Sequence, residues 1–180
     1  MRDRFDIIVA CDLNRGIGVN NQLPWRIPGD MKYFKNLTVK AEGEGLHNLC
    51  IMGRKTWESI PEKHRPLVDR YNLVLTRQKD YPLPEGVFKA DSLDAALDFV
   101  RTGPVDRVFI IGGEQIYKEA VLHDRVGYLC LTEVRHRFEC DAFFPEFQPY
   151  FHLISCSEIT TENGIDYCFK VFRPNILGEV

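Results

Sequence analysis

The stretch GIGVNNQLPWRIPGDMKYF, residues 16–34, joins a strand-like apolar run to a helical pattern. Its first part has the composition of a long irregular segment, and one carboxylate, Asp30, follows where the helical pattern begins. From Asp30 the spacing i, i+4, i+7 reaches Phe34 and Leu37, so the acid lies on the stripe expected to face the interior. Connections of this length are uncommon and tend to be lids or binding loops. We therefore expect a lid carrying an exposed Trp25 beside a binding site.

Asp30 has two interpretations that the residue alone does not separate. An Asp placed just before an apolar-periodic run is a common helix N-cap, and the local pattern favours that role. Burying a carboxylate without hydrogen-bond donors costs several kcal/mol, so an acid on this stripe also suits a cationic or amide-rich ligand. The unusual segment before Asp30 favours the ligand site.

Alternating strand and helix patterns predict an α/β fold in a single domain over residues 1–180. Continuous apolar runs typical of strands covered on both faces are residues 7–11, 49–52, 71–75, 108–111 and 126–131. Four helical patterns follow, at residues 30–38, 56–60, 92–101 with Ser92 as N-cap, and 114–122. This order predicts a central, mainly parallel, twisted sheet of about eight strands flanked by four helices.

The last part of the chain predicts an antiparallel hairpin. Residues 153–159 and 167–173 are strand-like, and the segment between them contains Asn163-Gly164, a strong hairpin turn signal. We therefore expect the sheet to end in two antiparallel strands joined across this turn.

Composition and charge narrow the class of protein. The chain has 180 residues, 44% of them hydrophobic and 27% charged, which fits one globular domain with a full core. A net charge of −3 creates no overall field that favours nucleic acid or an anionic membrane. Residues 1–6 lack an apolar signal-peptide core and no apolar run is long enough to span a bilayer. We expect a cytoplasmic protein with no nucleic-acid or membrane partner.

The cysteines do not predict a metal site. They lie at positions 11, 50, 130, 140, 156 and 168, mostly inside apolar runs and never in a Cys-x-x-Cys pair. A zinc site needs closely spaced thiolate or imidazole ligands, and His136 with Cys140 has no second pair to complete it. We therefore expect buried free thiols and no bound metal.

Three predicted strands are followed by turns rich in glycine or cations, at residues 53–56, 76–79 and 112–115. Open sheets bind ligands beyond the carboxyl ends of their strands. Glycine lets the backbone approach a phosphate, and the amides at a helix start point at it. Solvated basic side chains are the alternative for each turn alone, but three together favour a polyphosphate ligand.

The usual dinucleotide fingerprint is incomplete in this chain. Gly16-Ile17-Gly18 lacks the third glycine, and no helical pattern follows it directly. If the ligand is nevertheless a dinucleotide, the basic turns favour a 2′-phosphate, and hence NADPH over NADH.

These pieces, in this order, resemble the dihydrofolate reductase family over essentially the whole chain. The motifs are Gly-Ile-Gly at 16–18, Leu-Pro-Trp at 23–25, Asp30 with Phe34, Ile-Met-Gly-Arg-Lys-Thr-Trp-Glu-Ser-Ile at 51–60, Arg-Pro-Leu at 65–67, Ile-Gly-Gly at 111–113 and Phe-Phe-Pro at 143–145. The resemblance implies NADPH-dependent reduction of 7,8-dihydrofolate, with hydride transfer to C6 and protonation at N5. It also implies antifolate binding and a monomer.

The resemblance also implies roles for individual residues. Asp30 would bind the pterin, Thr132 would hydrogen-bond Asp30 and the pterin amine, and Trp25 would hold an ordered water; with the lid residue Leu23 they form the implied catalytic set. Further substrate-binding residues are Val9, Ala10, Phe34, Lys35, Ile60, Leu67, Ile111 and Arg70, the last as a clamp for the glutamate carboxylate. Implied cofactor-binding residues are Ala10, Ile17, Gly18, Gly53, Arg54, Lys55, Thr56, Thr76, Arg77, Ile111, Gly112, Gly113, Glu114, Gln115, Ile116 and Tyr117.

Two alternatives remain open at this point. One is another NADPH-dependent reductase of similar fold, such as the pyrimidine reductase of riboflavin synthesis. Its phosphorylated ribityl substrate should not need the combination of Asp30, Phe34 and Arg70. The other is a catalytically silent nucleotide-binding protein, which turnover measurements would distinguish from an enzyme.

Overall fold

A single twisted sheet forms the centre of the computed structural model, which describes residues 4–175. Its strands are β1 (Phe5–Cys11), β3 (His47–Gly53), β4 (Tyr71–Leu75), β5 (Val87–Ala90), β6 (Val105–Ile110), β7 (Val126–Val134), β9 (Phe151–Cys156), β10 (Thr160–Glu162) and β11 (Ile165–Pro174). The order is β10-β11-β7-β1-β6-β3-β4-β5, with β9 also paired to β11. Neighbours from β7 to β5 are parallel, whereas β11 pairs antiparallel with β7, β9 and β10.

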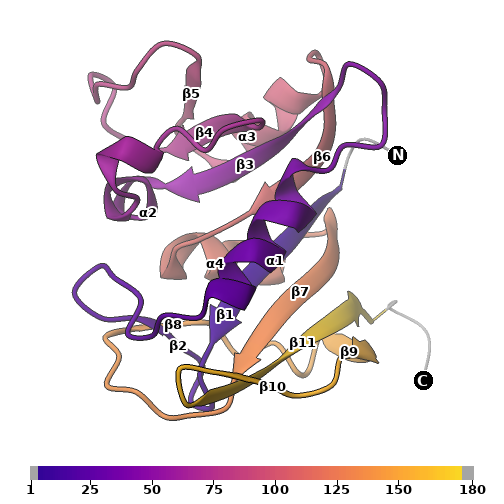
Figure 1. Ribbon diagram of the computed structural model, residues 1–180. Coiled ribbons are helices and arrows are strands. Elements are labelled where there is room, and N and C mark those ends of the chain that lie inside the picture. The colour runs from indigo at the N-terminus through magenta and orange to yellow at the C-terminus, as the bar shows by residue number, and fades with distance from the viewer. Residues whose placement is uncertain (1–3, 176–180) are drawn as a thin grey trace.

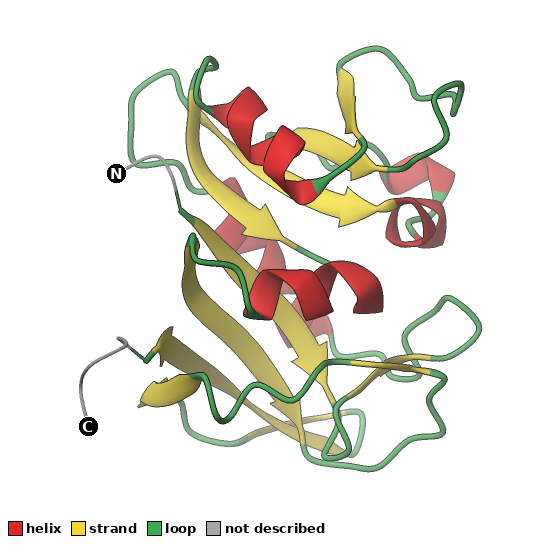
Figure 2. Ribbon diagram, turned by 180° about the vertical axis from the view of Figure 1, so that it is seen from behind, coloured by secondary structure: helices red, strands yellow, loops and turns green. Residues whose placement is uncertain are grey.

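Helices cover both faces of this sheet, as the sequence predicts. Within residues 4–175 they are α1 (Pro28–Val39), α2 (Arg54–Ser59), α3 (Leu93–Val100) and α4 (Glu114–Val121), with a 3₁₀ turn at Glu62–His64. Helix α1 crosses the front of the sheet in Figure 1, and α3 and α4 lie in front in the reverse view of Figure 2. The predicted α/β class with a mainly parallel sheet is confirmed.

Strand β1 shows why the predicted strands read as continuous apolar runs. Ile7 and Val9 are buried in the cluster that contains the apolar residues of α3 and α4. Ile8, which points to the opposite face, is buried with Trp57 of α2. Because both faces are covered, alternation between apolar and polar residues disappears.

The segment before α1 is more regular than its composition predicts. Residues of β2 (Gly16–Gly18) pair with β8 (Ala142–Phe143) to form a small antiparallel sheet. The bridge between Val19 and Gln22 tightens the same segment. Strands this short have no readable period, so only contact with a distant part of the chain defines them.

The C-terminal hairpin forms at the expected turn but with a different first arm. Asn163 and Gly164 have φ of 50° and 72°, as a tight hairpin turn requires. The arm that pairs across this turn is β10, whereas β9 ends at Cys156 and pairs farther along β11. The predicted strand over 153–159 is therefore wrong at its end, because the two-residue turn brings the immediately adjacent residues into register.

Candidate active site

An open cleft of about 1620 Å³ lies beyond the carboxyl ends of β1, β3, β4 and β6. The three turns singled out in the sequence, at 53–56, 76–79 and 112–115, line it, except that Lys79 lies outside the lining. Parallel strands bring their carboxyl ends to one edge of a sheet, which is why turns far apart in the sequence meet there. The predicted juxtaposition of these turns is therefore present.

Asp30 lies in this cleft as a buried acid with one close partner. It is the third residue of α1, and Ile27 is the N-cap, so the N-cap interpretation of Asp30 is wrong. Its side chain is buried, with the residue only 8% exposed, and Oδ1 accepts a hydrogen bond of 2.6 Å from Thr132 Oγ1 on β7. Burial raises the pKa of Asp30, and the Thr132 hydrogen bond partly opposes this rise.

The start of α1 is fixed by the hairpin instead of by a side-chain cap of its own. Pro28 occupies the first turn, where its missing N–H costs nothing. Glu162 Oε1 accepts from Gly29 N at 2.8 Å, and Asn163 Nδ2 donates to Arg26 O at 2.8 Å. A carboxylate at a helix start also interacts favourably with the helix dipole. The hairpin thus positions the turn that carries Asp30.

Apolar side chains form the wall next to Asp30. Phe34, Ile60 and Leu67 all line the cleft, as the family resemblance implies. Arg70 does not line it, but its guanidinium lies 6.0 Å from the Phe34 ring and donates 2.9 Å to Thr38 Oγ1. Lys35, from the same predicted set, is exposed and lies outside the cleft lining.

Trp25 is buried, not exposed as expected, and does not line the cleft. Its exposed fraction is 7%, and its ring packs 5.4 Å from that of Phe138. The indole Nε1 is a buried donor without a hydrogen-bond partner among the described residues. Buried donors are almost always satisfied, so this nitrogen suits an ordered water or a bound molecule.

The segment that precedes α1 spans the two sides of the cleft. Asn21 Nδ2 donates 2.9 Å to the carbonyl of Lys55 at the start of α2. On the strand that pairs with β2, Phe143 N donates 2.9 Å to Glu114 Oε1 of α4. Leu23, 49% exposed, lines the cleft from this segment. These contacts fit the predicted lid.

Glycines at the end of β6 allow close packing around the floor of the cleft. Gly112 has φ of +127°, and a Cβ there would lie 3.3 Å from Thr56 Oγ1. A Cβ on Gly113 would lie 3.2 Å from the same oxygen. Tyr117, one turn into α4, donates 2.8 Å to Ile8 O and fixes α4 against the sheet. Both glycines also line the cleft, so their backbone, which carries no Cβ, borders the space for a ligand.

Basic and hydroxyl side chains supply what a dinucleotide phosphate needs. Lys55 and Arg77 are exposed in the cleft, and Thr56 and Thr76 line it beside them. Arg54 pairs with Glu58 at 2.9 Å, which offsets part of its conflict with the helix dipole. Together with the open glycine turn, this donor set fits the phosphates of NADPH.

A family model described as dihydrofolate reductase matches residues 4–173. The chain belongs to the dihydrofolate reductase family. The dihydrofolate reductase of Aedes albopictus is 40% identical in an alignment 180 residues long, gaps included, that covers 94% of this chain and 97% of that protein. The dihydrofolate reductase of Bos taurus is 44% identical over 179 residues, covering 93% and 96%. The bifunctional dihydrofolate reductase-thymidylate synthase of Daucus carota is 41% identical over 179 residues, covering 93% and 33%.

The dihydrofolate reductase resemblance stated from the motifs is thus confirmed. Among the residues that it implied for the site, Trp25, Lys35 and Arg70 do not line the cleft, whereas the others do. Their individual roles remain predictions. In the described part of the chain, no group of three or more His, Cys, Asp or Glu side chains is arranged for a metal ion. No helix in residues 4–175 is long and apolar enough to cross a membrane.

Several cleft residues carry no readable signal in the sequence. Met31 is 55% exposed and lines the cleft one position after Asp30. Asn21 lines it with φ of 59°, a conformation that a single sequence does not reveal. Others missed in the same way are Gln22, Ser59, Pro61, His64, Asp141 and Ala142. None of these residues belongs to an apolar stripe, and no motif gives any of them a role in the site, so only the folded chain assigns them to it.

Proposed function

We propose that this chain reduces 7,8-dihydrofolate to 5,6,7,8-tetrahydrofolate with NADPH. The observation that carries the proposal is Asp30, a buried carboxylate bonded to Thr132 inside a cleft lined by basic and glycine-rich turns. Membership of the dihydrofolate reductase family supports it over the pyrimidine reductase alternative. An intact acid and phosphate-binding set also argues against a silent nucleotide-binding protein.

The substrate's pterin would bind to Asp30 through one edge of its ring. A carboxylate offers acceptors to a neighbouring amino group and ring N–H, which matches the 2-amino group and N3 of the pterin. Thr132 donates to Asp30 and has lone pairs left for the pterin amine. Phe34, Ile60 and Leu67 would contact the benzoyl group, and Arg70 would bind the glutamate carboxylate as a fork.

Lys55, Thr56, Thr76 and Arg77, with the backbone at Gly112 and Gly113, would hold the cofactor phosphates. When bound, NADPH supplies the hydride that is transferred to C6 of dihydrofolate. The exposed cation Arg77 would meet the 2′-phosphate, which NADH lacks. Ala10 and Ile111, which line the cleft, would form the floor under the pterin and the nicotinamide.

Protonation at N5 is assigned to water and not to Asp30 directly. Asp30 would bind the opposite edge of the pterin, so its role is to orient the ring and stabilise charge. The free Nε1 donor of buried Trp25 would hold a water near this acid. The lid that contains Asn21 and Leu23 would exclude bulk solvent during hydride transfer.

Loss of NADPH absorbance in the presence of dihydrofolate tests the proposal directly. We expect rapid oxidation that depends on dihydrofolate and is much slower with NADH. NADPH binding without oxidation would retain the cofactor site and overturn the substrate assignment.

A monomeric state, a cytoplasmic location and antifolate binding belong to the same proposal. Size-exclusion chromatography with light scattering tests the first, and inhibitor titration the last.

A further inference from the structure

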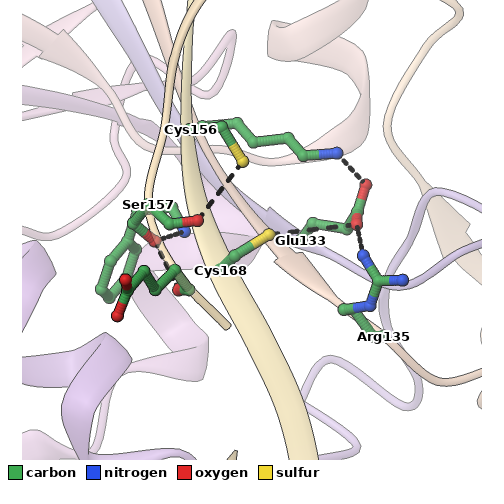
Figure 3. Close-up of polar contacts among 8 residues, drawn as sticks. Glu133, Arg135, Cys156, Ser157 and Cys168 are labelled. Carbon is green, nitrogen blue, oxygen red and sulfur yellow. Dashed lines mark hydrogen bonds and ion pairs between the residues drawn. The ribbon is translucent and has the colours of Figure 1, made fainter. Parts of the chain in front are cut away.

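Cys156 and Cys168 lie on adjacent strands away from the cleft. Cys156 ends β9 and is in register with Lys170 of β11. Cys168 precedes Lys170 by two residues, so both thiols emerge on the same face of the sheet. In Figure 3 the two side chains lie near one another, with the Cys156 Sγ directed at the Ser157 carbonyl, 3.4 Å away, and the Cys168 Sγ directed at Glu133. The two cysteines are thus a diagonal cross-strand pair.

The two thiols differ in accessibility. Cys156 is exposed, contrary to the expectation of buried cysteines, whereas Cys168 is only 2% exposed. Burial raises the pKa of Cys168, and Glu133 and the Cys156 side chain raise it further. Cys168 Sγ lies 4.0 Å from Glu133 Oε1, and Lys170 Nζ holds the other carboxylate oxygen at 2.6 Å. Cys156 is therefore the thiol that meets a reagent first.

The end of β9 lies against β11 next to the two cysteines. Cα atoms of diagonal pairs are about 7–8 Å apart, and disulfides usually require about 4.4–6.8 Å. A small displacement must therefore bring the strands together. Pairing continues just past β9, because Ser157 N donates to Phe169 O at 2.8 Å and Phe169 N donates to Ser157 Oγ at 2.8 Å. These contacts hold the two strands together beside the cysteines, so only a small further approach is required.

We propose that Cys156 and Cys168 form a reversible disulfide when the protein meets a small-molecule disulfide such as glutathione disulfide. The Cys156 thiolate attacks one sulfur of the reagent, breaks its S–S bond and releases one small thiol. Cys168 then attacks the Cys156 sulfur and releases the second small thiol. The two protein thiols are oxidised, the reagent is reduced, and the two protons end on the released thiols.

The cross-link would enclose the segment that supports α1. Residues 157–167 lie between the two cysteines and contain Glu162 and Asn163. Glu162 accepts from Gly29 N, and Asn163 donates to Arg26 O, both next to the turn that carries Asp30. Closing this loop restricts the unfolded chain and stiffens the support of α1. The proposal does not depend on dihydrofolate reduction.

Peptide mapping of the full chain tests the cross-link. After treatment with glutathione disulfide and alkylation of free thiols, non-reducing mass spectrometry should find Cys156 joined to Cys168. Dithiothreitol should reverse the link. The Tm of the oxidised protein should rise by about 5 °C. Cys156→Ser and Cys168→Ser should both lose the link and the Tm gain. Cys140→Ser, which removes a half-buried thiol elsewhere, should keep both.

Other products would overturn the proposal. These are a stable mixed disulfide at Cys156 with Cys168 still alkylated, a Cys156 link between two molecules, or a link from Cys156 to another cysteine. If Cys168→Ser does not fold, the map of the unmutated chain and the Cys156→Ser variant decide the question.

Discussion

Asp30, to which we assign a role in the reaction, carries a cost to folding. Its folded-state pKa lies above the ordinary value of 3.8, because burial disfavours the charged form. The unfolded chain therefore ionises this carboxyl more easily than the folded protein. Below pH 3.8 the carboxyl is protonated in both states and costs the fold nothing. As the pH rises above this value the free energy of unfolding falls, and the loss is complete once the pH exceeds the raised pKa of the folded protein.

Asp30→Asn should therefore stabilise the protein while it impairs the enzyme. We expect a Tm gain of a few degrees at about pH 8 and a smaller gain at about pH 4. The hydride step should slow by about 100-fold or more in single-turnover measurements, with little change in NADPH affinity. Equal Tm gains at both pH values would contradict the assigned cause, and unchanged turnover would remove Asp30 from the mechanism.

We expect Thr132 to act on the same reaction through its hydroxyl. Thr132→Val keeps the side-chain shape but removes the 2.6 Å hydrogen bond to Asp30 Oδ1. A hydrogen bond to a charged group contributes about 1.5–3 kcal/mol, so kcat/KM for dihydrofolate should fall by roughly 10- to 100-fold. Thr132→Ser retains a hydroxyl and should recover most of the loss. Equal losses in both variants would point to packing and not to the hydrogen bond.

At the scale of elements, the β10–β11 hairpin determines how well α1 presents Asp30. Glu162→Ala removes the acceptor for Gly29 N and for Tyr167 Oη, which donates to the same oxygen at 2.6 Å. We expect a loss of about 1–2 kcal/mol in the free energy of unfolding and a higher KM for dihydrofolate. Urea denaturation and steady-state kinetics measure the two effects. Glu158→Ala, an exposed acid in the same segment, is the matched control and should change neither.

At the scale of the whole molecule, cofactor binding joins turns from separate strands. The turns after β3, β4 and β6 line one cleft, so NADPH should stabilise the entire sheet. A ligand at 100 times its Kd contributes about 2.7 kcal/mol, which predicts a Tm rise of about 5–10 °C for NADPH. NADH should give a smaller rise, because it has no 2′-phosphate.

Arg77→Ala should reduce the NADPH shift to that of NADH and leave the NADH shift unchanged. Lys79→Ala, two positions along the same turn but outside the cleft lining, should preserve the difference between the two cofactors. Thermal denaturation measures the Tm shift of each of the two variants with NADPH and with NADH. If Arg77→Ala still prefers NADPH, another cation must bind the 2′-phosphate.

The sequence alone determined the α/β class, the order of the main elements and the three turns beyond the strand ends. Continuous apolar runs and helical stripes report burial directly, and glycine or cation turns report local chemistry. The tertiary structure decided the features that depend on distant partners. Asp30 is an acid of the cleft and not a helix cap, because two partners come from distant parts of the chain. Thr132 donates to the Asp30 carboxylate, and Glu162 accepts from Gly29 N at the start of the helix. Trp25 is buried because Phe138 packs on it, a contact between residues far apart in sequence that no local pattern encodes.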